Sequence, residues 1–177
     1  LAFLTNPKLI VLDEPTTALD VTTQAKILET IRALCRRRGA AAVYISHDLA
    51  IVRNLVDRVI VLYAGRIVEA GPSDLLFMSP AHPYTRGLLD ATPNASRDGE
   101  LRPIAGEPAT PGARPAGCAF APRCPRATAA CASYNIRPTL LNLQHEVACV
   151  HPMTAQETTP QVSAFVQTER QRAGVAL

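Results

Sequence analysis

Two adjacent carboxylates, Asp13 and Glu14, follow directly on the apolar run 9–12 and precede a proline. Four apolar residues in a row predict a strand that is buried on both faces, as in a parallel sheet. In open α/β sheets, ligands bind at the carboxyl ends of such strands. Two acidic side chains at the end of a buried strand cost free energy unless a ligand there needs them. Magnesium prefers hard oxygen ligands and keeps several of its waters. We therefore predict that Asp13 serves Mg²⁺, directly or through water, and that Glu14 acts on a water that attacks a phosphate.

The run from residue 9 to Asp20 resembles the Walker B motif and D-loop of ABC-transporter ATPases. The resemblance rests on the apolar strand, on Asp13-Glu14-Pro15 and on the sequence Thr-Ala-Leu-Asp at 17–20. An Asp-Glu pair alone would indicate only an exposed strand end. The resemblance implies an α/β fold, namely the C-terminal portion of a P-loop ATPase domain with a parallel-sheet core. It also implies ATP and Mg²⁺ as cofactors and a place for Asp20 at the interface between two ATPase subunits.

A second buried strand is predicted over residues 40–46, and it ends at His47. A helix over 21–38, which Gly39 ends, would connect the two strands. Carboxyl ends of parallel strands meet at one edge of a sheet, so His47 is expected on the same side as Glu14. The sequence Ile-Ser-His-Asp at 45–48 resembles the switch-loop histidine of the ABC family. That resemblance implies that His47 contacts the γ-phosphate.

The middle of the chain predicts a hairpin and a helix. Residues 59–63 and 66–69 form the hairpin strands, with Gly65 in the turn, and a helix runs from 82 to about 91. The stretch 61–71 resembles the end of an ABC nucleotide-binding domain. The sequence His-Pro-Tyr-Thr at 82–85 resembles the oligopeptide/dipeptide-importer branch. His82 has no ligand-type neighbour in sequence, so we interpret it as local structure.

The chain has five cysteines, an odd number, which favours metal binding or chance over disulfides in a cytosolic protein. Cys35 lies on the apolar face of the predicted helix, so we interpret it as a residue of the hydrophobic core. The other four are Cys118, Cys124, Cys131 and Cys149, and the first three of them fall in a proline-rich, weakly apolar segment, where a metal could supply folding energy. Four thiolates fit zinc or an iron–sulfur cluster, and four unligated thiols remain the alternative.

The residues around these cysteines resemble the C-terminal region of oligopeptide/dipeptide importer ATPases. Some members of that group hold a [4Fe–4S] cluster on the four cysteines, so the resemblance favours this cluster, with zinc as the second choice. His145 and His151 flank Cys149 and could replace a thiolate in a zinc site. Arg123, next to Cys124, is expected to lower the pKa of that thiol.

The resemblance divides the chain into three parts. Residues 1–92 correspond to the C-terminal part of an ABC nucleotide-binding domain with Walker B, D-loop and H-loop, and 93–152 to the importer C-terminal region. A tail over 153–177 is expected to be loosely ordered. No glycine of the 177 residues is followed by lysine, so they contain no G-x-x-x-x-G-K-[ST] phosphate loop. Because the phosphate loop supplies most of the nucleotide affinity, we expect the 177 residues alone to be inactive as an ATPase. Because the chain opens without methionine, we expect a front part before it.

These observations predict an ATPase subunit that powers the import of peptides or similar solutes. The expected partners are a second ATPase subunit, transmembrane permease subunits and, indirectly, an extracytoplasmic solute-binding protein. The subunit would lie peripherally on the cytoplasmic face of the membrane. A formal charge of +3 with scattered arginines favours no nucleic-acid partner. One alternative is a catalytically inactive fragment or a metal-binding regulatory module that lacks the phosphate loop. Another, a soluble ABC ATPase of repair or translation, is disfavoured by the importer-like stretches.

Overall fold

The computed structural model describes residues 3–17, 19–92, 102–110, 112, 114–133, 136–154 and 157. By packing, the chain divides into two compact units, Leu1–Val56 and Asp57–Leu177. The boundary that we predict between residues 92 and 93 comes from the resemblance to a family. The boundary between Val56 and Asp57 comes instead from the contacts within the folded chain. Most of the predicted tail, and residues 93–101 of the segment before the cysteines, lie outside the described residues.

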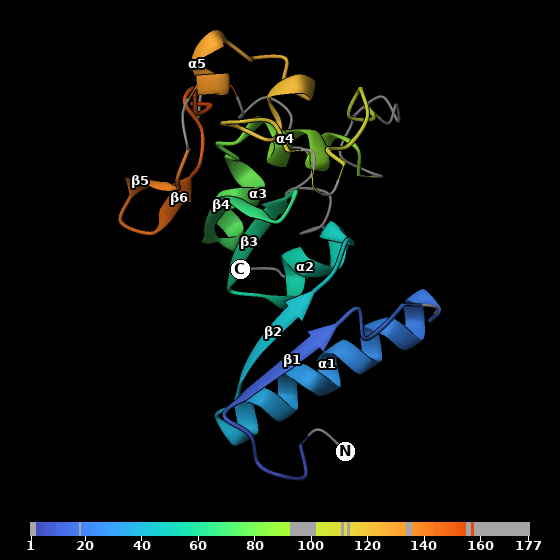
Figure 1. Ribbon diagram of the computed structural model, residues 1–177. Helices are drawn as coiled ribbons and strands as arrows, with labels where there is room; N and C mark the ends of the chain where they lie inside the picture. The colour runs from blue at the N-terminus through green and yellow to red at the C-terminus, as the bar shows by residue number, and fades with distance from the viewer. Residues whose placement is uncertain are drawn as a thin grey trace. The chain divides into compact units, whose positions relative to one another are not determined.

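The first unit is a β-α-β arrangement followed by a second helix. Strand β1 (Leu9–Asp13) leads to helix α1 (Val21–Arg38), strand β2 (Ala41–Ile45) and helix α2 (Leu49–Leu55). The strands pair in parallel, from Leu9 opposite Ala41 to Asp13 opposite Ile45. The predicted parallel pairing is therefore confirmed, and the carboxyl ends of β1 and β2 lie side by side (Figure 1).

The two faces of this sheet differ in burial. Ile10 of β1 is buried together with Leu28 and Cys35 of α1, so Cys35 belongs to the core as predicted. On the opposite face Val11 is 62% exposed and its partner Val43 46%. The prediction that both faces are buried is therefore wrong within the described residues of this unit. Strand side chains alternate between the two faces of the sheet, and helix α1 covers the face that carries Ile10.

The second unit is built on an antiparallel sheet. Strands β3 (Arg58–Tyr63) and β4 (Arg66–Pro72) form the predicted hairpin, and Gly65 adopts φ 73° in its turn. Two short strands that the sequence did not predict complete the sheet, β5 (Thr139–Asn142) and β6 (His145–Val147). The order is β3-β4-β6-β5, because β6 pairs with β4 (Figure 1). The segment between Cys131 and Cys149 is thereby joined to the hairpin.

The second unit also contains short helices. They are α3 (Ser73–Met78), α4 (Pro83–Asp90), a single 3₁₀ turn at Ala121–Arg123 and α5 (Ala129–Ser133). The rings of Tyr63, Tyr84 and Phe120 pack together with centroids 4.7 to 5.3 Å apart, which links β3, α4 and the segment that carries Cys118 and Cys124. Among the described helices, none is long and apolar enough to span a membrane.

Candidate functional site

Glu14 and His47 meet at the carboxyl ends of β1 and β2. The Glu14 N–H donates to Ile45 O at 3.0 Å, which extends the strand pairing by one residue. His47 Nδ1 lies 2.8 Å from Glu14 Oε1, and the Thr17 hydroxyl donates to Oε2 at 3.0 Å. Glu14 has φ 43°, a left-handed conformation that is uncommon outside glycine and is frequent at functional turns. The sequence predicted this convergence across 33 residues of chain.

Each member of this pair favours the charged form of the other. The bond from His47, then that from Thr17, lowers the pKa of Glu14 below its usual value. The bond to Glu14, followed by its charge, raises the pKa of His47 above its usual value. The side chains remain open to solvent, at 43% exposure for Glu14 and 79% for His47. An ionised carboxylate and a protonation-prone imidazole are therefore both accessible to a ligand.

The other two predicted acids lie near this pair along the chain. Asp13 is the last residue of β1 and is exposed. Asp20 caps α1, since its Oδ1 accepts hydrogen bonds from the N–H groups of Thr22 and Thr23 at 3.1 and 3.0 Å. Hydrogen bonds from Thr23 lower the pKa of Asp20. The structure thus gives Asp20 a local capping role that the sequence analysis did not foresee.

A small hydrogen-bonded group fixes the loop between Glu14 and Asp20. Thr16 is buried, and its hydroxyl lies 3.0 Å from the Tyr44 hydroxyl. Gln24 Nε2 donates a hydrogen bond to the Thr16 hydroxyl at 2.8 Å. The loop is therefore tied to both β2 and α1. Sequence reasoning missed this group; the available signal was a tyrosine within the second predicted strand.

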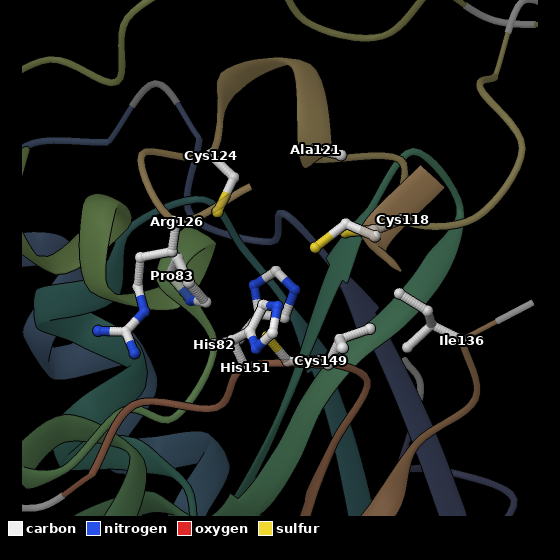
Figure 2. Close-up of a pocket in the computed structure, with 11 residues that line it drawn as sticks. His82, Pro83, Cys118, Ala121, Cys124, Arg126, Ile136, Cys149 and His151 are labelled. Atoms are coloured by element: carbon white, nitrogen blue, oxygen red, sulfur yellow. The ribbon is translucent and has the colours of Figure 1, made fainter. Parts of the chain in front are cut away.

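The four clustered cysteines line one pocket of the second unit. Cys118, Cys124, Cys131 and Cys149 contribute to its wall, together with His82 and His151 (Figure 2). The Cys118 N–H donates to Cys131 O at 2.8 Å, which brings the backbones of two of these cysteines together. Gly117 permits this approach, since a Cβ at that position would lie 2.3 Å from Cys131 O. The gathering of the four thiols at one place was predicted from sequence.

The thiols of this pocket influence one another. Burial raises the pKa of Cys118 and Cys124, and raises that of Cys149 to about 11. The other three cysteines add electrostatically to the pKa of Cys149. Backbone N–H groups oppose these effects, with Phe120 and Ala121 donating to Cys118, Arg126 to Cys124 and His151 to Cys149. Such N–H donors stabilise the thiolate, the form that binds metals.

The described residues do not hold the cysteines in a single-ion arrangement. No group of three or more His, Cys, Asp or Glu side chains within them is placed to hold one metal ion. The expected effect of Arg123 on Cys124 is wrong, because the Arg123 guanidinium turns to Ile104 O and Ala105 O. Arg126 is the arginine that lowers the Cys124 pKa, and burial outweighs it.

The predicted substitute ligand His145 lies elsewhere. It is buried and its Nε2 bonds to Glu69 Oε1 at 2.7 Å, so it does not line the cysteine pocket. Glu69 is fully buried and also accepts the N–H of Ala81 at 2.6 Å and of His82 at 3.0 Å. His151 does line the pocket, with Nε2 2.8 Å from the Thr128 hydroxyl.

His82 belongs to local structure, as we interpret it from the sequence, but its place in the wall of the cysteine pocket was not foreseen. Its side chain is 1% exposed and caps α4, where Nδ1 accepts the Tyr84 N–H at 3.0 Å. Burial lowers its pKa to about 4, an effect that Glu69 opposes in part. No sequence neighbour of His82 has a ligand-type side chain, so only the folded chain brings it to the cysteines.

Comparison with known proteins identifies relatives of both units. Residues 68–131 match the family model "Oligopeptide/dipeptide transporter, C-terminal region". The chain is 48% identical over 144 residues to the oligopeptide transport ATP-binding protein AppD of Bacillus subtilis, a match that covers 80% of this chain and 43% of AppD. It is 47% identical over 153 residues to the di/tripeptide transport ATP-binding protein DppF of Pseudomonas aeruginosa, covering 85% of this chain and 47% of DppF. The predicted resemblance to importer ATPases is confirmed.

The matches are partial with respect to the relatives. The dipeptide transport ATP-binding protein DppD of Bacillus subtilis is 41% identical over 150 residues, which cover 84% of this chain and 45% of DppD. The chain thus spans a little under half the length of these curated relatives.

Proposed function

We propose that Asp13, Glu14 and His47 form the water-and-magnesium side of an ATP-hydrolysing site in a subunit that powers peptide import. The observation that carries this proposal is the 2.8 Å contact between Glu14 and His47 at the adjacent ends of parallel strands. The names of the relatives, which are transport ATP-binding proteins for peptides, support the substrate and the process.

The geometry suggests a role for each side chain. Glu14 is ionised, and its carboxylate can orient the attacking water and accept a proton from it. The raised pKa of His47 favours the imidazolium, whose Nδ1 donates to Glu14 while Nε2–H is left to donate to a γ-phosphate oxygen. Asp13, exposed at the end of β1, would hold Mg²⁺ through water, and the ion would neutralise phosphate charge. Asp20 would lie at the interface with a second ATPase subunit.

The remaining features of the proposal belong to the assembly. The 177 residues contain no phosphate loop, which normally supplies much of the nucleotide affinity, so this chain alone should bind ATP weakly and not turn it over. The complete motor would comprise two ATPase subunits and transmembrane permeases, supplied by a solute-binding protein. It would lie on the cytoplasmic face of the membrane.

A chimaera tests the catalytic assignment. The 144 matching residues of AppD are replaced by those of this chain, and ATP turnover and ATP binding are measured. Glu14→Gln should lower turnover by roughly 10²- to 10⁴-fold, as expected for loss of a general base, while ATP binding is kept. His47→Ala should also lower turnover.

Glu29→Gln is the matched control, because Glu29 is an exposed glutamate on α1. It should leave both turnover and binding unchanged. Full turnover in the Glu14→Gln chimaera would overturn the assignment of the base, and an inactive parent chimaera would count against the ATPase proposal as a whole.

A second function is favoured by the cysteine pocket. We propose that Cys118, Cys124, Cys131 and Cys149 bind a [4Fe–4S] cluster, with zinc as the weaker alternative. Four thiols line one pocket and three of them receive backbone N–H donors, which suits a group held by thiolates. Tetrahedral zinc would need all four sulfurs within about 4 Å of one another, and the described residues offer no such single-ion arrangement. A bound cluster supplies one-electron redox chemistry and folding energy.

Anaerobic incubation of the chain with equal amounts of ferrous and ferric iron and with sulfide tests this second proposal. We expect a brown protein with about four irons per chain, the composition of a [4Fe–4S] cluster. Cys124→Ala should lower the iron content, whereas Cys35→Ala, at the buried cysteine of the first unit, should not. Equal iron loss in both variants, or no iron in the parent chain, would contradict the proposal.

A further inference from the structure

His82 has a buried hydrogen-bonding atom for which the fold provides no partner. In the part of the chain that the structure describes, His82 Nε2 is one of three buried side-chain atoms without a hydrogen bond. The residue lines the cysteine pocket and is 1% exposed, and Figure 2 draws its side chain among the cysteines. An unsatisfied buried polar group costs about 1 to 3 kcal/mol, so such an atom indicates a partner that the protein chain itself does not provide.

The hydrogen bond at the other ring nitrogen decides what kind of partner this is. Nδ1 accepts the backbone N–H of Tyr84 at 3.0 Å, so the lone pair of Nδ1 is occupied and that nitrogen carries no proton. In a neutral imidazole the proton must then reside on Nε2. Nε2–H is a donor, and it would have to lose its proton to become a metal ligand. The missing partner is therefore an acceptor within the pocket.

Several contacts hold the ring in this orientation. The Glu69 carboxylate accepts the backbone N–H groups of Ala81 and His82, and thereby anchors the start of α4 to β4. The His82 ring also packs near Phe120, with centroids 6.0 Å apart. His151, the other imidazole of the pocket, differs because its Nε2 already pairs with the Thr128 hydroxyl.

We infer that His82 Nε2–H donates a hydrogen bond to a sulfur of the group that the four cysteines bind. This inference rests on the proposed cysteine site. The surrounding acceptors in the pocket are sulfurs, since its lining is formed largely by the four cysteines and apolar residues. A donor to sulfur favours the more negative, reduced form of a cluster and so raises its reduction potential. His82 is thus a tuning residue and not a ligand.

Two substitutions separate the donor from the helix cap. Asn at position 82 can still accept the Tyr84 N–H and cap α4, but its shorter side chain offers no group in place of Nε2. Gln reaches further and can place an amide N–H where Nε2–H lies, but it loses the cap. If His82 has only a structural role, His82→Gln should lower stability more than His82→Asn does. If Nε2–H donates to sulfur, His82→Asn should shift the reduction potential more than His82→Gln does.

The experiment measures the midpoint potential of the full chain after anaerobic loading with equal amounts of ferrous and ferric iron and with sulfide. His82→Asn should load normally, and its ratio of reduced to oxidised cluster at a fixed potential should fall about tenfold, which is ~59 mV for a one-electron couple. His82→Gln should restore most of the parent potential despite a less stable α4. His151→Asn is the matched control and should shift the potential less.

The outcomes distinguish this inference from the proposal on which it rests. A loaded His82→Asn chain with the parent potential overturns the inference alone. A parent chain that binds no cluster overturns both the cluster proposal and the inference, and leaves the ATPase proposal untouched. Long-range ¹H–¹⁵N NMR of the metal-free chain adds an independent readout: Nε2 protonation of His82 supports the inference, and Nδ1 protonation overturns it.

Discussion

Among the described residues, two glutamate–histidine pairs have nearly equal N–O distances but lie in opposite surroundings. Glu14 and His47 lie 2.8 Å apart with side chains 43% and 79% exposed. Glu69 and His145 lie 2.7 Å apart with side chains 0% and 4% exposed. The first pair leaves one imidazole nitrogen and much of the carboxylate to solvent. In the second, both carboxylate oxygens are engaged, by His145 and by the N–H groups of Ala81 and His82.

The contrast shows that the contact itself does not define a functional site. A buried carboxylate with all its acceptors occupied stabilises the fold, because removal of one member leaves several groups unsatisfied. An exposed pair contributes little to stability and remains free to react with a ligand. The predictions that follow separate these two roles, beginning with the largest effect.

Substitution of Glu69 should produce the largest loss of stability. Glu69→Ala leaves the His145 imidazole and two backbone N–H groups without their acceptor inside the protein. We expect a cost of about 3 to 5 kcal/mol, because three buried hydrogen-bonding groups lose their acceptor at once. Native-state hydrogen exchange of the β4 and β6 amides measures this cost locally.

The matched variant at the exposed pair is Glu14→Ala. It should change the exchange of β1 and β2 amides by no more than about 0.5 kcal/mol, as is usual for exposed pairs. Equal costs at the two positions would remove the distinction between a structural and an accessible pair.

The exposed pair was predictable from sequence, and the buried pair was not. The run at 9–12 and the apolar segment before His47 indicated two parallel strands, and the ends of parallel strands meet at one edge. Glu69 and His145 are 76 residues apart and meet only through the register of β4 with β6. The short strands β5 and β6 lack a clear alternation of apolar and polar residues, so no local signal announced them.

Other predictions failed because they depend on what covers a surface. The apolar run of β1 indicates a strand correctly, but burial of Val11 requires a layer on its face that the described residues of this unit do not supply. The gathering of the cysteines followed from their neighbours in sequence, whereas the roles of His82 and His145 depended on contacts between distant segments. Local patterns specify elements, and long-range packing decides the surroundings of each side chain.

Gly117→Ala should cause the next largest loss of stability, because the backbone at Gly117 packs closely against that of Cys131 and Ala132. Gly117 has φ 80°, and a Cβ there would lie 2.3 Å from Cys131 O. Gly112 has φ 86° but a Cβ there would meet nothing within 4 Å, so Gly112→Ala is a control for backbone strain alone. The control should cost about 1 to 2 kcal/mol, and Gly117→Ala a further ~1 to 2 kcal/mol from the clash. Thermal melting measures both changes.

Iron binding extends this test from stability to the cysteine pocket. Gly117→Ala should separate Cys118 from Cys131 and so lower the iron content after anaerobic loading, whereas Gly112→Ala should load like the parent chain. Identical melting and loading of the two variants would show that the close approach of residue 117 to Cys131 is not required.

The smallest expected effect is the pH dependence of the exposed pair. The pKa of His47 is raised above its ordinary 6.5, so its stabilising contribution is complete below pH 6.5 and is lost as pH rises through the folded-state pKa. The pKa of Glu14 is lowered from 4.5, so its contribution is present above pH 4.5 and is lost as pH falls through the folded-state pKa. Both contributions are therefore complete between pH 4.5 and 6.5.

Proton NMR titration of the histidine rings measures this coupling directly. His47 should titrate above 6.5 in the parent chain and return toward 6.5 in Glu14→Gln, because the bond to Glu14 is the main cause of its shift. Asp48→Asn should move the His47 pKa less, since the charge of Asp48 is the weakest of the causes. The buried His82 provides an internal reference, with a pKa of about 4. A parent His47 that titrates at or below 6.5 would mean that the two side chains do not pair in solution, and Glu14 would lose the contact that distinguishes it from an ordinary surface acid.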